Sequence, residues 1–93
     1  MKNYSRANTG IDLNLIPVFI EIVRCGSMAK ASLRLEMSRP AVSLALKRFN
    51  QLFDEPLFLR KGLYLEPTEK ALALTSSLEI LMGEIHDNIG ALN

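Results

Sequence analysis

The stretch MSRPAVSLALKRF, residues 37–49, decides how the rest of the chain can fold. Ser38 carries a hydroxyl that can accept a hydrogen bond from a free amide at a helix N-terminus. Pro40 follows in the first turn, where a helix needs no amide donor. The stretch therefore predicts a helix that begins after Ser38 and covers about residues 39–53.

This helix has two faces of different chemistry. The inner face is apolar, with side chains three or four residues apart: Val42, Leu46, Phe49 and Phe53. The other face carries Arg39, Ser43, Leu44 and Lys47, close to the positively polarised end of the helix. Donors, positive charge and one apolar group suit the DNA major groove, which presents acceptors, thymine methyl groups and flanking phosphates.

Two shorter helices are expected before it. Apolar residues recur at helical spacing over residues 15–23, with Asn14 as the expected N-cap and Gly26 as the residue that ends the helix. Ser27 then caps a second helix of about two turns. Its inner face is predicted to consist of Met28, Ala31, Ser32 and Leu35. Only residues 36–37 separate it from the next cap, and two helices joined by so short a turn cross at a large angle, as in a helix-turn-helix.

A small β-hairpin is expected next. Residues 57–60 and 64–66 are candidate strands around the turn 61–63, between two prolines. A lone two-stranded hairpin is marginally stable, so this one must lean on the helices as a wing. Arg60 and Lys61 in the wing are placed to reach a phosphate or the minor groove, and the alternative is that both are ordinary solvated charges.

The last segment predicts one long helix. Thr68 can cap it, and Glu69 stands in the first turn, where the helix dipole favours an acid. A heptad seam then runs through Ala71, Leu74, Leu78, Leu81, Ile85, Asn88 and Leu92. Over residues 69–92 such a helix extends about 36 Å, too long to pack entirely on so small a domain. We expect the last six seam residues to pair with a second copy, with Asn88 fixing the register; the alternative is a helix folded back on the first three.

Charge is divided unevenly along the chain. Residues 24–61 contain eight basic and three acidic residues, a local charge of +5. Residues 62–93 contain one basic and five acidic residues, a local charge of −4. This polarity indicates that one surface meets a polyanion. Two solvated faces of opposite sign would be the alternative.

Composition excludes several classes of protein. The chain has 93 residues, 48% of them hydrophobic, which allows one small domain with a modest core. It contains no apolar run of membrane-spanning length and no signal peptide, so a cytoplasmic location is expected. His86 has no neighbouring ligand residues and Cys25 is the only cysteine, which predicts no metal site, no cofactor and a packing role for Cys25. No nucleophile and base are paired in the sequence, and we expect no enzyme activity.

Several short motifs together resemble one family. They are Asp-Leu-Asn-Leu at 12–15, Val18-Phe19, Gly26-Ser27, Ser-Arg-Pro-Ala-Val-Ser at 38–43, Leu57-Phe58 with Arg60, and Pro67-Thr68 with Ala71. In this combination the sequence resembles the N-terminal DNA-binding domain of LysR-type transcriptional regulators. Asp-Glu-Pro-Leu-Phe followed by Glu-Pro-Thr resembles the branch with LeuO-like and nodulation regulators. The resemblance implies a mainly α fold with a small β-hairpin: a winged helix-turn-helix followed by a long linker helix.

The resemblance also implies a division of the chain. Residues 1–11 would be a flexible tail, residues 12–67 the winged helix-turn-helix, and residues 68–93 the linker helix that pairs two subunits, compatible with a tetramer in the full-length protein. A C-terminal domain that binds an effector would follow in a longer regulator, and we expect the chain to be a fragment that lacks it.

Contacts with double-stranded DNA are expected from ten residues. The base contacts implied by the family fall on Arg39, Pro40, Ser43 and Leu44. The backbone contacts are expected from Ser38, Lys30, Lys47, Arg60, Lys61 and Thr68. The family usually has Gln in place of Arg39, a polar or basic residue in place of Leu44, and Gly in place of Glu36. Arg39 suits a guanine and Leu44 a thymine methyl, so these departures concern base preference.

Two functions from different classes follow from the sequence. The first is sequence-specific binding of double-stranded DNA by a dimer. The second is a helical protein-interaction module, in which the long helix is the functional surface and the basic middle keeps the protein soluble.

Overall fold

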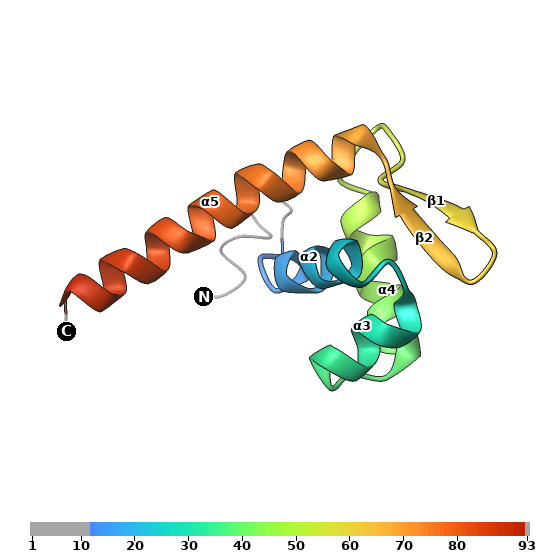
Figure 1. The fold of residues 1–93 in the computed structure, drawn as a ribbon, viewed down its shortest axis with the longest axis horizontal. Coiled ribbons are helices and arrows are strands. Elements are labelled where there is room, and N and C mark those ends of the chain that lie inside the picture. Colours follow the sequence, from blue (N-terminus) through green and yellow to red (C-terminus); the bar gives the residue numbers. More distant parts are fainter. Residues whose placement is uncertain (1–11, 93) are drawn as a thin grey trace.

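The computed structural model describes residues 12–92, with side chains described as far as Asp87. The elements are α2 (Leu15–Cys25), α3 (Met28–Leu35), α4 (Arg39–Asn50), β1 (Phe58–Lys61), β2 (Tyr64–Pro67) and α5 (Glu69–Leu92). Figure 1 shows three short helices packed together, a hairpin beside them and a long helix across them. The expected mainly α winged helix-turn-helix is therefore confirmed, while the predicted tail, residues 1–11, lies outside the described residues.

The start of α2 differs from the prediction in its hydrogen bonding. Asn14 occupies the N-cap position but makes no capping bond with its side chain. Instead the backbone amide of Asn14 donates to the Asp12 carboxylate at 3.0 Å, and the amide of Leu15 donates to the Asp12 carbonyl at 3.0 Å. An aspartate side chain readily bonds an amide two residues on. The helix boundary was predicted correctly and the capping group was wrong.

The two turns of the helix-turn-helix follow the local rules. Gly26 ends α2 with a left-handed φ of 67° and donates its amide to the Ile22 carbonyl. The Ser27 hydroxyl accepts the Lys30 amide and the Ser38 hydroxyl accepts the Ala41 amide, each at 3.2 Å. Both predicted serine caps are confirmed, so the sequence places the N-termini of α3 and α4 without help from distant contacts.

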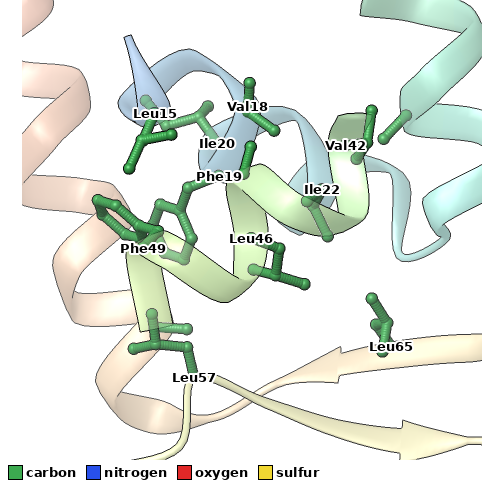
Figure 2. Packing of buried hydrophobic residues seen from close by; sticks show 13 residues of the cluster. Leu15, Val18, Phe19, Ile20, Ile22, Val42, Leu46, Phe49, Leu57 and Leu65 are labelled. Atoms are coloured by element: carbon green, nitrogen blue, oxygen red, sulfur yellow. The ribbon is translucent and has the colours of Figure 1, made fainter. Parts of the chain in front are cut away.

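The core lies where α2, α4 and the wing meet (Figure 2). Phe19 is fully buried, with its ring centroid 4.6 Å from that of Phe49 and 5.8 Å from that of Phe58. Val42 and Leu46 are buried with Phe49, so the predicted inner face of α4 is the face that packs. The predicted inner face of α3 is also confirmed, with two buried and two partly buried side chains: Ala31, Ser32, Met28 and Leu35.

The predicted extent of α4 is too long. The helix ends at Asn50, and the amides of Leu52 and Phe53 bond three residues back, to Phe49 and Asn50. This tight turn still places the Phe53 ring 5.3 Å from the Phe49 ring, which explains the helical spacing of the apolar residues. A tightened last turn satisfies the final carbonyls of a helix.

The wing is an antiparallel hairpin whose loop is shorter than predicted. Lys61 pairs with Tyr64, so the loop contains only Gly62 and Leu63. Gly62 has φ 62° at the first central position, where type II′ turns take glycine. The Leu65 amide donates to the Gly26 carbonyl at 2.9 Å, and the Leu65 side chain is buried. This bond and this side chain hold the wing against the turn between α2 and α3.

Thr68 joins the wing to α5. Its hydroxyl donates to the Pro56 carbonyl at 2.9 Å and accepts the Ala71 amide at 3.3 Å, so the predicted cap is confirmed. From there α5 crosses α2 and continues beyond the other elements (Figure 1). An ion pair of 2.7 Å between Arg24 and Glu79 joins the two helices. Within residues 12–92 no helix is both long and apolar enough to cross a membrane.

Glu36 carries the one strained backbone conformation among the described non-glycine residues, with φ 57° at the end of α3. A left-handed conformation costs an L-residue about 1–2 kcal/mol, and glycine loses about 0.5–1 kcal/mol more chain entropy on folding. We therefore expect Glu36→Gly to raise the free energy of unfolding by roughly 0.5–1 kcal/mol, measured by urea denaturation.

Glu36→Ala is the matched control, because alanine also removes the exposed carboxylate but keeps the Cβ atom. It should give no comparable gain. Equal gains from both variants would mean that the carboxylate, and not the backbone, is the source of the strain.

Candidate nucleic-acid interface

A groove opens between the wing and the N-terminal ends of α3 and α4. Its lining includes five of the ten predicted contact residues: Lys30, Arg39, Pro40, Ser43 and Arg60. Three of these are cations, and no carboxylate lines the groove. The first residues of two helices also line it, so the positive ends of two helix dipoles face the same space. The groove therefore concentrates positive potential where an anion can enter.

The exposed face of α4 forms one wall. Arg39, Ser43 and Lys47 lie on successive turns and are exposed, whereas Val42 and Leu46 beside them are buried. Because the inner face is fixed in the core, the outer face keeps a constant orientation toward the groove. Leu44 is 47% exposed and lies outside the groove lining, farther round the helix.

A second groove continues the first toward the end of α4. It is lined by Met28, Ser43, Leu46, Lys47, Asn50, Gln51 and Arg60. Three of these residues also line the first groove, so the two form one trough along α4. Lys47, a predicted backbone contact, joins the others here.

The strand register places the side chains of Arg60 and Lys61 on opposite faces of the hairpin. Arg60 pairs with the buried Leu65, and directly paired residues project from the same face of a hairpin. Arg60 therefore projects from the inner face and lines both grooves. Lys61 projects from the outer face, where its ammonium pairs with the Glu66 carboxylate at 3.0 Å. Of these two cations predicted from the sequence, the grooves contain only Arg60.

The two hydroxyl residues predicted to contact the DNA backbone, Ser38 and Thr68, already serve as helix caps. The Ser38 hydroxyl accepts the Ala41 amide, and Ser38 is exposed at the start of α4. The Thr68 hydroxyl is bonded on both sides, and Thr68 is only partly exposed at the far end of the wing. Their contacts with a DNA backbone stay predictions.

The predicted seam of α5 divides into two parts. Leu74 and Leu78 pack against the core of their own domain. Leu81 and Ile85 are exposed, at 54% and 56%. The side chains of Asn88 and Leu92 lie outside the described residues. The first half of the helix is thus folded back on the domain, and the exposed apolar part begins after Leu78.

Some groove residues were not found from the sequence. Leu63 and Tyr64 of the wing contribute to the lining, and so do Met28 and Ala29 of α3 and its N-cap residue Ser27. The register of the strands and the bond from Leu65 to Gly26 bring these segments together, and neither can be read from local spacing.

Cys25 and His86 were expected to have no role in binding or redox chemistry. The Cys25 thiol is partly buried and lies 3.3 Å from a carboxylate oxygen of Glu21. Burial, and then the neighbouring Glu21, raise the pKa of this thiol, which favours its protonated form. Within the described part of the chain, no three potential metal ligands come together.

The comparison with known proteins agrees with the geometry. The LeuO transcriptional regulator of Escherichia coli is 38% identical over 68 residues, which are 73% of this chain and 22% of LeuO. A probable transcriptional regulator of Pseudomonas aeruginosa has a structure with a TM-score of 0.78 and 31% identity, matching 89% of this chain and 28% of its own. The complex of the CbnR DNA-binding domain with DNA gives a TM-score of 0.72 at 23% identity, over 87% of this chain and 97% of that one.

The chain spans about a fifth of the LeuO sequence. The family model for bacterial regulatory helix-turn-helix proteins of the LysR family matches residues 13–72, from the turn before α2 into the first turn of α5. These residues contain both serine caps, the wing and every residue of the two grooves. The chain belongs to the LysR family of bacterial regulatory helix-turn-helix proteins.

Proposed function

We propose that this chain is the DNA-binding domain of a LysR-type transcriptional regulator and binds double-stranded DNA at specific sequences. The observation that carries the proposal is the groove with three cations, two helix N-termini and no carboxylate. The phosphate backbone is the polyanion that such a surface attracts. The related CbnR domain, of similar fold, is known in complex with DNA.

In this function α4 enters the major groove and the wing lies at the flanking backbone or minor groove. Arg39, Pro40, Ser43 and Leu44 would contact the bases, because they lie on the exposed face at the N-terminal half of α4. Arg39 offers a bidentate pair of donors to a guanine, and Leu44 offers an apolar contact to a thymine methyl. Lys30, Lys47 and Arg60 would neutralise phosphates around them.

The exposed half of α5 supports a homodimer. Leu81 and Ile85 continue the apolar face that packs on the domain, but both are more than half exposed, and among the described residues they do not join the core cluster. A second copy could cover both, with α5 pairing along its exposed end. Two paired domains would read two half-sites, in the bacterial cytoplasm where chromosomal DNA lies. An effector would act through a further domain of a longer protein.

The rival function, a protein-interaction module without specific DNA binding, uses the same exposed end of α5. This function gives no role to the groove. Charges that only keep a protein soluble need not line one groove together, whereas the cations here do. We therefore favour DNA binding.

Arg39→Ala tests the base-reading face of α4. Loss of a bidentate contact with guanine should weaken binding by about 1–3 kcal/mol and relax the preference at one base position. The measurement is titration of a duplex selected from a random pool by the unaltered protein, compared with single-base variants of it. Arg48→Ala is the matched control, since Arg48 is exposed on α4 but lines neither groove. Equal losses from both variants would remove Arg39 from the base contacts.

Arg60 and Lys61 provide a test of the wing. Removing a phosphate contact lowers the slope of log affinity against log salt by about one. We expect this change from Arg60→Gln, which lies in the grooves, and little change from Lys61→Gln, whose ammonium pairs with Glu66. Binding would be measured at several salt concentrations. A larger change from Lys61→Gln would show that the outer face of the wing meets DNA.

Leu81→Lys tests the pairing of α5. A lysine in an apolar seam should leave the protein monomeric and weaken its binding to paired half-sites, as measured by analytical ultracentrifugation and duplex titration. Ile80→Lys is the matched control, because Ile80 is also exposed, at 63%, but lies outside the seam. A dimer that survives Leu81→Lys would contradict pairing through this seam.

A further inference from the structure

The side chain of Asn50 contains an unsatisfied polar atom. Its carboxamide oxygen is buried and has no hydrogen-bond partner, and it is the only such side-chain atom among the described residues. Buried acceptors in folded proteins are almost always bonded, so an exception needs an explanation. Asn50 is the last residue of α4 and lines the second groove.

Two cations line the same groove as Asn50, namely Lys47 and Arg60. Lys47 lies three residues before Asn50 on the same helix, and long side chains in a helix lean toward its N-terminus. The Lys47 ammonium therefore leans away from Asn50. Arg60 approaches from the opposite wall, because the strand register directs it from the inner face of the wing. Among the described residues Arg60 takes part in no ion pair.

We propose that Asn50 is a positioning residue for Arg60. When DNA occupies the groove, the buried oxygen of Asn50 accepts one hydrogen bond from the Arg60 guanidinium. A guanidinium has five N–H donors in a fixed plane, so the remaining donors stay available for a phosphate. This inference rests on the proposed function and adds a residue that neither charge nor sequence spacing indicated.

The physical benefit is a fixed orientation of the Arg60 guanidinium in the complex with DNA. A free arginine on a two-stranded wing samples many rotamers, and binding must restrict them. A bond to a buried oxygen on α4 restricts them through an element that is itself fixed in the core by Phe49. Asn50 would thereby couple the position of the wing cation to the orientation of the recognition helix.

The test replaces the acceptor without changing any charge. Asn50→Leu should bind the duplex selected by the unaltered protein about three- to tenfold more weakly, as expected for one lost hydrogen bond. Because Arg60 is then no longer held at its phosphate, the salt slope should also fall, by up to about one, although no charge was removed. The affinity loss should disappear when Asn50→Leu is introduced into Arg60→Gln, since the two residues act as one unit.

Asn14→Leu is the matched control. Asn14 carries the same functional group but is exposed at the start of α2, makes no capping bond with its side chain and lines neither groove, so its loss should change neither affinity nor salt slope. The melting temperature of Asn50→Leu should not fall, because the change removes an acceptor without a partner. Should that variant unfold, Asn50→Ala serves the same measurement.

Three results would overturn the proposal: an unchanged affinity of Asn50→Leu, a weaker affinity with an unchanged salt slope, or losses that add in the double variant. Failure of the unaltered protein to bind any selected duplex would instead overturn the proposed function itself. The two failures are therefore distinguishable in one set of titrations.

Discussion

The contact between Phe19 and Phe49 is the interaction on which the rest of the structure depends. It joins α2 to α4 at a ring-centroid distance of 4.6 Å, and the ring of Phe58 from the wing contacts Phe19 from another side. Three elements far apart in the sequence are thus held by one buried side chain. Because the inner face of α4 is fixed there, its outer face has a single orientation, and the groove takes its shape from the wing that the same core holds.

Much of the fold was predictable because its signals are local. The serine caps at Ser27 and Ser38 and the left-handed Gly26 depend only on residues within one turn, and all three were predicted correctly. The errors arose where a second local arrangement could satisfy the same sequence pattern. Asp12 replaced Asn14 as the acceptor at the start of α2, and a tight turn after Asn50 reproduced helical spacing without an α-helix.

The candidate site was predictable in chemistry and less so in geometry. The sequence indicated which residues of α4 are exposed, because the apolar face identifies the opposite one. It did not distinguish Arg60 from Lys61, since that difference depends on a strand register that a one-residue slip would reverse. Nor did it indicate Asn50, whose burial arises only from tertiary packing.

In the long helix, too, the sequence pattern does not determine which residues are buried. Its apolar seam is continuous in the sequence, yet Leu74 and Leu78 serve the core of their own domain while Leu81 and Ile85 are exposed. A heptad pattern therefore does not by itself say which partner covers it. Here the length of the helix relative to the domain divides the seam, at the point where α5 passes the end of α2 and the Arg24–Glu79 ion pair anchors it.

The ion pairs show which of the basic residues remain available to bind an anion. Of the eight basic residues in residues 24–61, three are paired with carboxylates among the described residues: Arg24, Arg34 and Lys61. Of the remaining five, four line the two grooves and only Arg48 does not. Four of the five cations without a carboxylate are therefore gathered on one surface. If the basic segment served only solubility, its unpaired cations would not need to lie at the same grooves. The charge pattern therefore argues for a polyanion at the trough along α4.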